Sequence, residues 1–203
     1  MLGSAAKLRI LALHGFRGSG AALRRQTRAF SAGIAEEAEL VFVDAPARAD
    51  GGVGWWRALE ETGADGHVVK RYDGWTTSRD FIAEYCKREG PFDGVFGFSQ
   101  GATLAGLLVA LNAAPTFGFA ILVGGFASAD PEHVPIYRAG ACHVPSLHII
   151  GLSDGVVPPE RSRALADSFH EPWILEHAGG HVVPDSVEVR DGVLAFLRKL
   201  RAR

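Results

Sequence analysis

Short apolar segments alternate with longer segments of helical periodicity along most of this 203-residue chain. The apolar segments predict strands at residues 8–13, 40–43, 94–98, 119–123, 146–150 and 173–176. The segments between and after them predict helices at residues 21–38, 77–88, 100–111, 159–169 and 187–200. Apolar strands joined by helices form a mostly parallel sheet with helices on both faces. We therefore expect an α/β fold and, because no repeat or linker divides the sequence, a single domain over residues 1–203.

The charge balance and the cysteine content limit the expected partners and compartment. Lys and Arg number 21 against 23 Asp and Glu, so there is no field of one sign that would hold nucleic acid. Two cysteines cannot form a disulfide framework, and the residues before Lys7 contain no apolar stretch of signal-peptide length. The longest apolar run, residues 102–111, is about half a membrane span. We expect a cytoplasmic protein with no membrane span and no nucleic-acid partner.

One short motif carries the chemistry. Residues 97–101 read GFSQG and lie between a predicted strand and a predicted apolar helix, which is the setting of a G-x-S-x-G nucleophile elbow. A serine raised on such a strained turn leaves no room for side chains two positions before and after it, which explains Gly97 and Gly101. The first amides of the following helix would stabilise a developing negative charge. Ser99 is therefore the candidate nucleophile, although so short a pattern also arises by chance in glycine-rich turns.

A serine nucleophile needs a histidine to accept its proton and an acid to orient that histidine. In α/β-hydrolases the three residues follow the order serine, acid, histidine. Asp154 and His181 each follow a predicted strand in that order, at the sheet edge where functional residues gather. Asp130 is the alternative acid, but the sequence Asp130-Pro131 is more typical of a turn or a helix start. We therefore predict Ser99, Asp154 and His181 as the catalytic residues.

The remaining histidines are given no catalytic role. His177 is the nearest alternative base, and its spacing from His181 is that of some metal ligands. Gly179 and Gly180 lie between them, however, and argue against a helix that presents both rings to one ion. We expect no metal and no cofactor. The histidines interpreted as structural are His67, His133, His143, His148 and His170.

An acyl-transfer site also needs two N–H groups that converge on the oxyanion. The amide of Gln100, which follows the nucleophile, is the first candidate. The second is the amide of Phe16 in the glycine-rich loop at residues 14–20, after the first predicted strand. A phosphate cradle is the alternative interpretation of this loop, but its glycine spacing matches neither G-x-G-x-x-G nor a P-loop.

Three aromatic residues are candidates for substrate binding. Trp55 and Trp56 lie in a segment rich in glycine, tryptophan and arginine after the second predicted strand, and Phe126 follows the strand after the elbow helix. All three would lie over the carboxyl edge of the sheet, where an apolar acyl group would be bound. The alternative is that the tandem tryptophans fill the core beside the sheet.

Several ordered motifs are similar to those of the FSH-type family of small serine hydrolases. They are LHGF at residues 13–16, LVFVDAP at 40–46, WW at 55–56, GPFDGVFGFSQG at 90–101, PSLHIIG at 145–151, DGVVP at 154–158 and GGHVVP at 179–184. The resemblance runs from about residue 8 to residue 196. It implies the α/β-hydrolase fold with a minimal cap, the triad of Ser99, Asp154 and His181, and esterase or thioesterase chemistry. Some relatives resemble enzymes that release acyl chains from carrier proteins.

These inferences predict a serine carboxylesterase or thioesterase that acts through an acyl-enzyme, on substrates with an apolar acyl chain. The expected partner is a small-molecule ester or thioester, and an acyl carrier protein is a further candidate. An acyltransferase would use the same triad but would exclude water from the acyl-enzyme. A non-catalytic binding protein that retains the fold is the other alternative.

Overall fold

The computed structural model describes residues 6–47, 54–62, 67–111 and 115–202. Six strands form one sheet in the order β2-β1-β5-β6-β7-β8, and every neighbouring pair is parallel. The strands are β1 (Leu8–Leu13), β2 (Ala38–Val43), β5 (Gly94–Phe98), β6 (Ala120–Val123), β7 (Ser146–Gly151) and β8 (Trp173–His177). The sequence-based prediction of a parallel α/β sheet is confirmed, and all six predicted strands form within two residues of their expected starts.

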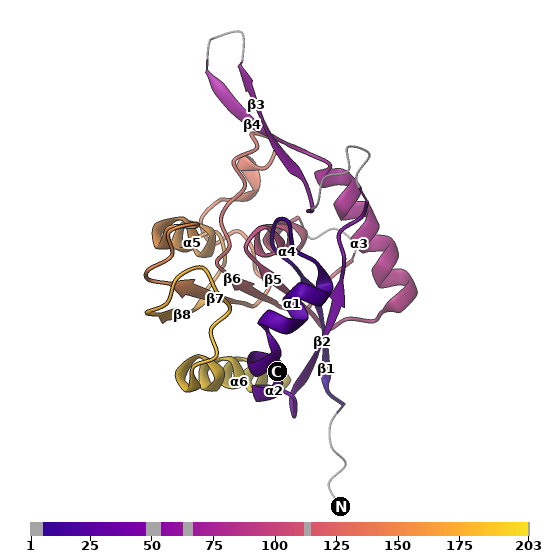
Figure 1. Cartoon of the computed structure of the whole chain (residues 1–203), viewed down its shortest axis with the longest axis vertical. Coiled ribbons are helices and arrows are strands. Elements are labelled where there is room, and N and C mark those ends of the chain that lie inside the picture. Colours follow the sequence, from indigo (N-terminus) through magenta and orange to yellow (C-terminus); the bar gives the residue numbers. More distant parts are fainter. Residues whose placement is uncertain (1–5, 48–53, 63–66, 112–114, 203) are drawn as a thin grey trace, which may run out of the picture.

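Helices cover both faces of this sheet (Figure 1). One face carries α1 (Gly20–Gln26), α2 (Arg28–Gly33) and α6 (Val187–Arg201). The other carries α3 (Trp75–Glu89), α4 (Gln100–Ala110) and α5 (Pro159–Ala166). Alternate residues of β1 divide the core, because Ile10 and Ala12 pack with the first group of helices and Leu11 and Leu13 with the second. None of the helices in the described ranges is long and apolar enough to cross a membrane.

The helix predicted at residues 21–38 is instead two shorter helices. Thr27 separates α1 from α2, and its Oγ1 donates a hydrogen bond to the carbonyl of Leu23 at 2.9 Å. Such a local bond from a threonine side chain competes with continued helix formation. The chain then returns to the sheet at Ala38, which pairs with Leu8. The apolar periodicity therefore indicated helical structure correctly but missed the break and the early start of β2.

The helix predicted from residue 77 begins earlier, at Trp75. Gly74, with φ at 91°, is its N-cap, and no side chain caps it. Ser78 lies inside the helix and is fully buried. A glycine adopts this backbone conformation without the strain that a side chain would add.

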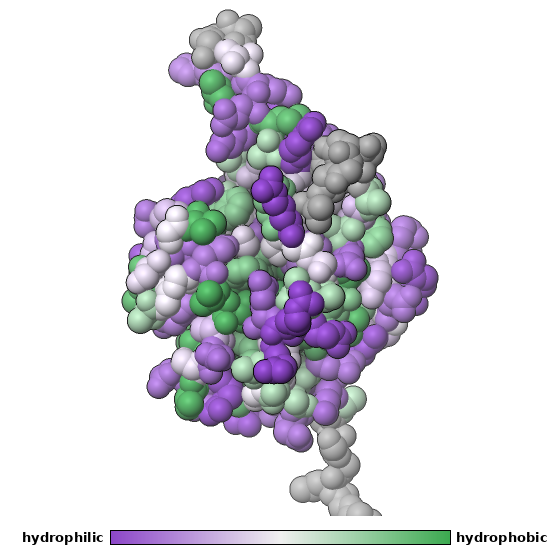
Figure 2. All heavy atoms as spheres, viewed as in Figure 1, coloured by the Kyte–Doolittle hydropathy of each residue, from purple (hydrophilic) through white to green (hydrophobic). Residues whose placement is uncertain are grey.

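The segment around Trp56 contains a hairpin that the sequence did not predict. β3 (Arg57–Thr62) and β4 (Val68–Asp73) pair antiparallel and project from the body of the molecule (Figure 1). Hydrophilic side chains cover most of its described part (Figure 2). The few apolar residues in these strands explain why no period of two was evident. Residues 48–53 and 63–66 of this segment lie outside the described part of the chain.

Candidate active site

Ser99 occupies the turn between β5 and α4. Its backbone has φ 56° and ψ −119°, a strained combination for a residue with a side chain. A side chain at Gly97 would collide with the carbonyl of Gly101 and with Ala102. A side chain at Gly101 would collide with the carbonyl of Leu13. Both glycines are therefore needed for the turn to close, as the G-x-S-x-G pattern predicts.

Asp154 and His181 meet at the same edge of the sheet, in the loops after β7 and β8. Nδ1 of His181 lies 2.6 Å from Oδ2 of Asp154. The other carboxylate oxygen accepts hydrogen bonds from the N–H groups of Val156 and Val157, both at 2.8 Å. Burial alone would raise the pKa of Asp154, but the hydrogen bonds that its two oxygens accept outweigh burial and lower this pKa. Asp154 is therefore ionised at neutral pH and holds the imidazole through Nδ1.

The ring of His181 packs between the turn that carries Ser99 and the loop after β6. Its centroid lies 4.8 Å from that of Phe98, the residue before Ser99. Gly124 has φ 55°, and a Cβ atom there would lie 3.1 Å from Cε1 of His181. Among the described residues no hydrogen bond joins Ser99 Oγ to His181. Contacts of this kind are often long in unliganded sites and tighten when substrate binds.

The two predicted oxyanion donors lie beside Ser99. Gln100 opens α4, and the N–H groups of a first helical turn have no acceptor within their helix. Phe16 lies in a turn after β1 that is closed by a hydrogen bond of 3.0 Å from the N–H of Gly18 to the carbonyl of Gly15. A Cβ atom at Gly15 would lie 3.3 Å from Cβ of Ser99. The loop after β1 therefore lies against the turn that carries Ser99, and the oxyanion role of Phe16 stays a prediction.

His14 fixes this loop, a role that was not predicted from the sequence. Its Nε2 accepts a hydrogen bond of 3.1 Å from the N–H of Ala45, so Nδ1 carries the proton and donates to the carbonyl of Gly15 at 2.8 Å. Burial lowers the pKa of His14 and outweighs the opposing effects of the Gly15 carbonyl and Asp44. A neutral imidazole therefore ties the loop after β1 to the chain after β2.

The side chain of Gln100 holds the tandem tryptophans. Its Oε1 accepts a hydrogen bond from the N–H of Trp55 at 3.0 Å, and its Nε2 donates to the carbonyl of Trp56 at 2.9 Å. Ser78 Oγ also donates to the carbonyl of Trp55. Gly54 has φ 133°, and a Cβ atom there would lie 2.8 Å from Oε1 of Gln100. The sequence suggested only the backbone role of Gln100, because a buried side-chain clamp leaves no periodic signal.

The two tryptophans have different positions, which corrects the prediction that both contact substrate. Trp55 is only 1% exposed, and its Nε1 donates to the carbonyl of His14 at 2.7 Å. This satisfied indole lies in the core and does not line the cavity beside Ser99. Trp56 is also nearly buried, at 3% exposed, but it does line that cavity, and its ring stacks on Tyr72 with centroids 4.8 Å apart and planes 11° apart.

A cavity of about 470 Å³ opens beside Ser99. Its uncharged lining residues are Phe16, Trp56, Ala58, Tyr72, Ser99, Gln100, Phe126, Ala129, Val156 and Val157. Its charged lining residues are Arg57, Lys70 and Arg161. Phe126, predicted to bind substrate, is held by Thr103, whose Oγ1 donates to the carbonyl of Phe126 at 2.8 Å. The cavity thus has mainly apolar and aromatic walls with a few polar groups, as small-molecule sites commonly do.

Asp130, the alternative acid, anchors the hairpin instead of the histidine. Its carboxylate accepts hydrogen bonds from the N–H of Tyr72 at 2.8 Å, the N–H of Glu132 at 3.0 Å and the guanidinium of Arg71 at 3.2 Å. Burial alone would raise the pKa of Asp130, but these contacts and nearby His133 outweigh it and lower this pKa. Asp130 therefore supports the part of β4 that reaches the cavity.

Among the described residues, two other serine–histidine pairs are hydrogen-bonded, and neither resembles a reactive pair. Ser128 Oγ lies 2.8 Å from Nδ1 of His133, and Ser146 Oγ lies 3.1 Å from Nε2 of His148. All four residues are buried. Burial lowers the pKa of His133, and lowers that of His148 to about 3, so His148 is a very weak base. These positions agree with the structural roles predicted for His133 and His148.

His177, the alternative base, lies at the end of β8. Its Nδ1 accepts a hydrogen bond of 3.2 Å from the N–H of Gly179, a local turn contact. Burial lowers the pKa of His177, which outweighs the opposing charge of Asp154. Asp154 hydrogen-bonds His181 and not His177. In the part of the chain that the structure describes, no group of three or more His, Cys, Asp and Glu residues is arranged to hold a metal ion.

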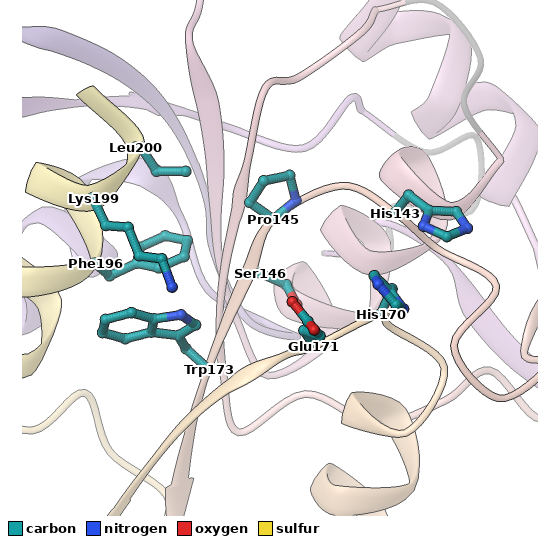
Figure 3. Close-up of a pocket in the computed structure, with 9 residues that line it drawn as sticks. All are labelled: His143, Pro145, Ser146, His170, Glu171, Trp173, Phe196, Lys199 and Leu200. Carbon is teal, nitrogen blue, oxygen red and sulfur yellow. The ribbon is translucent and has the colours of Figure 1, made fainter. Parts of the chain in front are cut away.

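A second, smaller cavity of about 120 Å³ lies at the opposite edge of the sheet, where β7 and β8 begin (Figure 3). His143 and His170 lie on one side of it, with ring centroids 4.9 Å apart. Lys199 and Trp173 lie on the other, with the ammonium 5.0 Å from the ring centroid. None of the predicted site residues lines this cavity. The candidate active site is therefore the cavity at the carboxyl edge.

A parallel sheet with a strained serine between strand and helix defines the class of α/β-hydrolases. The sequence matches the family described as "Serine hydrolase (FSH1)" over residues 3–193, and the chain belongs to this family. The family resemblance and the fold class predicted from the sequence are thereby confirmed.

Named relatives and solved structures agree with this assignment. The chain is 34% identical to esterase OVCA2 of Danio rerio over 228 residues, covering 98% of this chain and 100% of that protein. Its fold is similar to that of Zea mays acyl-protein thioesterase 2, with a TM-score of 0.64, 21% identity and 95% coverage of each chain. It is also similar to a carboxylesterase from Mesorhizobium loti, with a TM-score of 0.68, 22% identity and coverage of 97% and 92%.

Proposed function

We propose that this serine hydrolase cleaves small carboxylic esters through an acyl-enzyme on Ser99. The observation that carries the proposal is the hydrogen bond of 2.6 Å between Asp154 and His181 at the edge where Ser99 is held in a strained turn. The esterase names of relatives at 34% identity support the ester as the bond that is cleaved. Hydrolysis of a thioester uses the same steps and the same residues.

In the first half-reaction Ser99 Oγ attacks the substrate carbonyl carbon while its proton passes to Nε2 of His181. The carbonyl oxygen becomes negative and accepts hydrogen bonds from the N–H groups of Gln100 and Phe16. When the tetrahedral intermediate collapses, the leaving alcohol or thiol takes the proton from Nε2. The acyl group stays bound to Ser99 as an ester.

In the second half-reaction water replaces the alcohol. His181 accepts a proton from the attacking water. When the resulting tetrahedral intermediate collapses, the bond to Ser99 Oγ breaks, Nε2 of His181 returns the proton to Oγ, and the acid is released. Asp154 accepts the Nδ1–H of His181 throughout, which keeps Nε2 available as the base. Its lowered pKa supports this role, because an ionised carboxylate stabilises the imidazolium that forms in each step.

The lining of the cavity supports an apolar group next to the scissile bond. Trp56, Tyr72 and Phe126 supply aromatic surface, and Val156 and Val157 supply aliphatic surface from the loop that also positions Asp154. The volume of about 470 Å³ is within the range of pockets that bind small molecules.

A fluorophosphonate probe and a series of para-nitrophenyl esters test the proposal. The wild-type protein should be labelled and should hydrolyse the esters, whereas Ser99→Ala should do neither. A series of acyl chain lengths, measured in the wild type and in Trp56→Ala, should show a changed length preference in the variant. Added alcohol or thiol reports whether the acyl-enzyme partitions to acceptors other than water. Labelling of Ser99→Ala equal to that of the wild type would refute Ser99 as the nucleophile.

A further inference from the structure

The cavity beside Ser99 carries positive charge that the proposed chemistry does not use. Its charged lining residues are Arg57, Lys70 and Arg161, and no carboxylate of the described residues lines it. The chain as a whole has a formal charge of −2, so this local excess is opposite in sign to the net charge. Positive charges around a cleft raise the local concentration of anionic ligands.

Arg161 lies on the first turn of α5, at the side of the cavity formed by the loop after β6. Its guanidinium carbon lies 4.6 Å from the centroid of the Phe126 ring. Phe126 is itself fixed, because its N–H and its carbonyl both hydrogen-bond to Thr103 Oγ1. Within the described ranges no carboxylate lies within ion-pair distance of Arg161. The aromatic ring thus holds the guanidinium at the cavity while leaving its N–H donors available.

Lys70 approaches the cavity from the hairpin. In the β3–β4 register it lies opposite Glu60, but no ion pair within 4.0 Å joins the two. Lys70 is on the same strand face as Tyr72, whose ring stacks on Trp56 at the cavity wall. Lys70 therefore lines the cavity together with this aromatic surface.

Arg57 contributes less to this charge. Its guanidinium pairs with Asp73 at 3.6 Å, across the base of the hairpin. The excess charge at the cavity therefore rests mainly on Arg161 and Lys70, which come from different elements.

Building on the proposed function, we propose that the preferred substrates are esters with an anionic end group, a carboxylate or a phosphate, separated from the scissile carbonyl by an apolar spacer. The aromatic and aliphatic walls take the spacer, and Arg161 and Lys70 bind the end group. Arg161 offers a planar pair of donors suited to such oxygens, and Lys70 offers a compact charge. These two residues are specificity-determining and take no part in bond cleavage.

Matched ester pairs test this proposal and identify the side that carries the charge. On the acyl side, the para-nitrophenyl monoester of adipic acid is compared with para-nitrophenyl hexanoate. On the leaving-group side, the hexanoyl ester of para-hydroxyphenylacetate is compared with that of the corresponding primary amide. The quantity compared is the ratio of kcat/KM for the anionic ester to kcat/KM for its neutral partner. For at least one pair we expect this ratio to be about tenfold in the wild type and to fall as the salt concentration is raised.

Substitutions then link that ratio to the two cations. Arg161→Gln should lower the ratio about fivefold and Lys70→Gln about threefold, as expected for partly exposed ion pairs. Arg161→Lys keeps the positive charge and should therefore show a higher ratio than Arg161→Gln. Lys87→Gln removes an exposed cation from the far end of α3, where Lys87 pairs with Glu84, and should leave the ratio unchanged.

The outcomes separate this proposal from the proposed function. If the wild type hydrolyses the neutral esters but shows no preference in either pair, the anionic-substrate proposal is wrong and ester hydrolysis stands. A preference that Arg161→Gln and Lys70→Gln leave unchanged also refutes it. If neither neutral nor anionic esters are hydrolysed, the proposed function fails, and this proposal with it.

Discussion

Among the described residues, two hydrogen-bonded clusters can be compared that each contain a serine, a histidine and an aspartate, and only the first has a member, Ser99, that lines the described cavity. The first comprises Ser99, Asp154 and His181, at the carboxyl edge of the sheet. The second comprises Ser128, Asp130 and His133, in the segment after β6 that leads into the short 3₁₀ helix η1 (Val134–Ile136). Every member of the second cluster is 5% exposed or less. Residue types alone therefore do not distinguish a candidate active site from a structural network.

The orientation of the histidine distinguishes the two clusters. In the first, Asp154 contacts Nδ1 of His181, and Nε2 makes no hydrogen bond among the described residues. In the second, Ser128 contacts Nδ1 of His133, whose Nε2 is buried without a hydrogen-bond partner in the described structure. Asp130 meanwhile binds the hairpin. A buried network of this kind positions chain segments, whereas an acid–base pair at a cavity can transfer a proton to substrate.

The largest expected effect contrasts the two serines. Ser99→Ala should lower kcat for para-nitrophenyl esters by about 10⁴-fold or more, because it removes the nucleophile. Ser128→Ala should change kcat by less than about threefold, since that hydroxyl contacts only a buried histidine and a backbone amide. Steady-state kinetics at matched protein concentration, with circular dichroism to verify folding, make the comparison. Equal losses in the two variants would contradict the assignment of roles.

The next effect concerns Asp154. Asp154→Asn should lower kcat by about 10³- to 10⁴-fold, because an amide at this position does not hold His181 in the tautomer that leaves Nε2 free. Asp185→Asn, on the exposed loop before α6, is the matched control and should retain the wild-type rate. A rate for Asp154→Asn within tenfold of the wild type would show that Asp154 does not orient the base.

The sheet and the nucleophile turn were predictable because their signals are local. A buried strand is apolar over consecutive residues, and the turn at Ser99 requires small neighbours at fixed positions. The order of Asp154 and His181 after successive strands then follows from parallel topology, because the carboxyl ends of such strands meet at one edge.

The hairpin and the different positions of Trp55 and Trp56 were not predictable in this way. The strands β3 and β4 are mostly exposed and charged, so they lack an apolar period, and their position depends on a distant carboxylate, Asp130. Trp55 and Trp56 have the same residue type and adjacent positions. What separates them is the contact of Trp55 with His14 and that of Trp56 with Tyr72, both of which form only in the folded chain.

A smaller effect is expected at Asp130. In Asp130→Asn an amide NH₂ would face either the N–H of Tyr72, or both the N–H of Glu132 and the guanidinium of Arg71, so at least one backbone donor would lose its acceptor. Such a loss costs about 1–3 kcal/mol of the free energy of unfolding. Chemical denaturation measures this change, and hydrogen exchange should show less protection at Tyr72. KM should rise more than kcat falls, since the hairpin carries part of the cavity wall but none of the predicted triad.

If Asp130→Asn instead lowered kcat as strongly as Asp154→Asn, Asp130 would have to be the acid that orients the base. Conversely, an unchanged free energy of unfolding would show that the hairpin does not depend on this anchor.

The smallest effect is a dependence of stability on pH that arises from the buried histidine of the second cluster. Burial lowers the pKa of His133 in the folded protein, against the opposing charges of Asp130 and Glu132. Below its ordinary pKa of 6.5 the unfolded chain binds a proton that the folded protein does not. His133 therefore leaves the free energy of unfolding unchanged above pH 6.5. As pH falls from 6.5 toward the lower pKa of His133 in the folded protein, this group lowers the free energy of unfolding. His133→Asn should reduce the slope of the free energy of unfolding against pH by up to about 1.4 kcal/mol per unit, measured by urea denaturation at several pH values. Parallel slopes for wild type and variant would show that His133 has the same pKa in the folded and the unfolded protein. Burial would then not lower the pKa of the histidine in the second cluster.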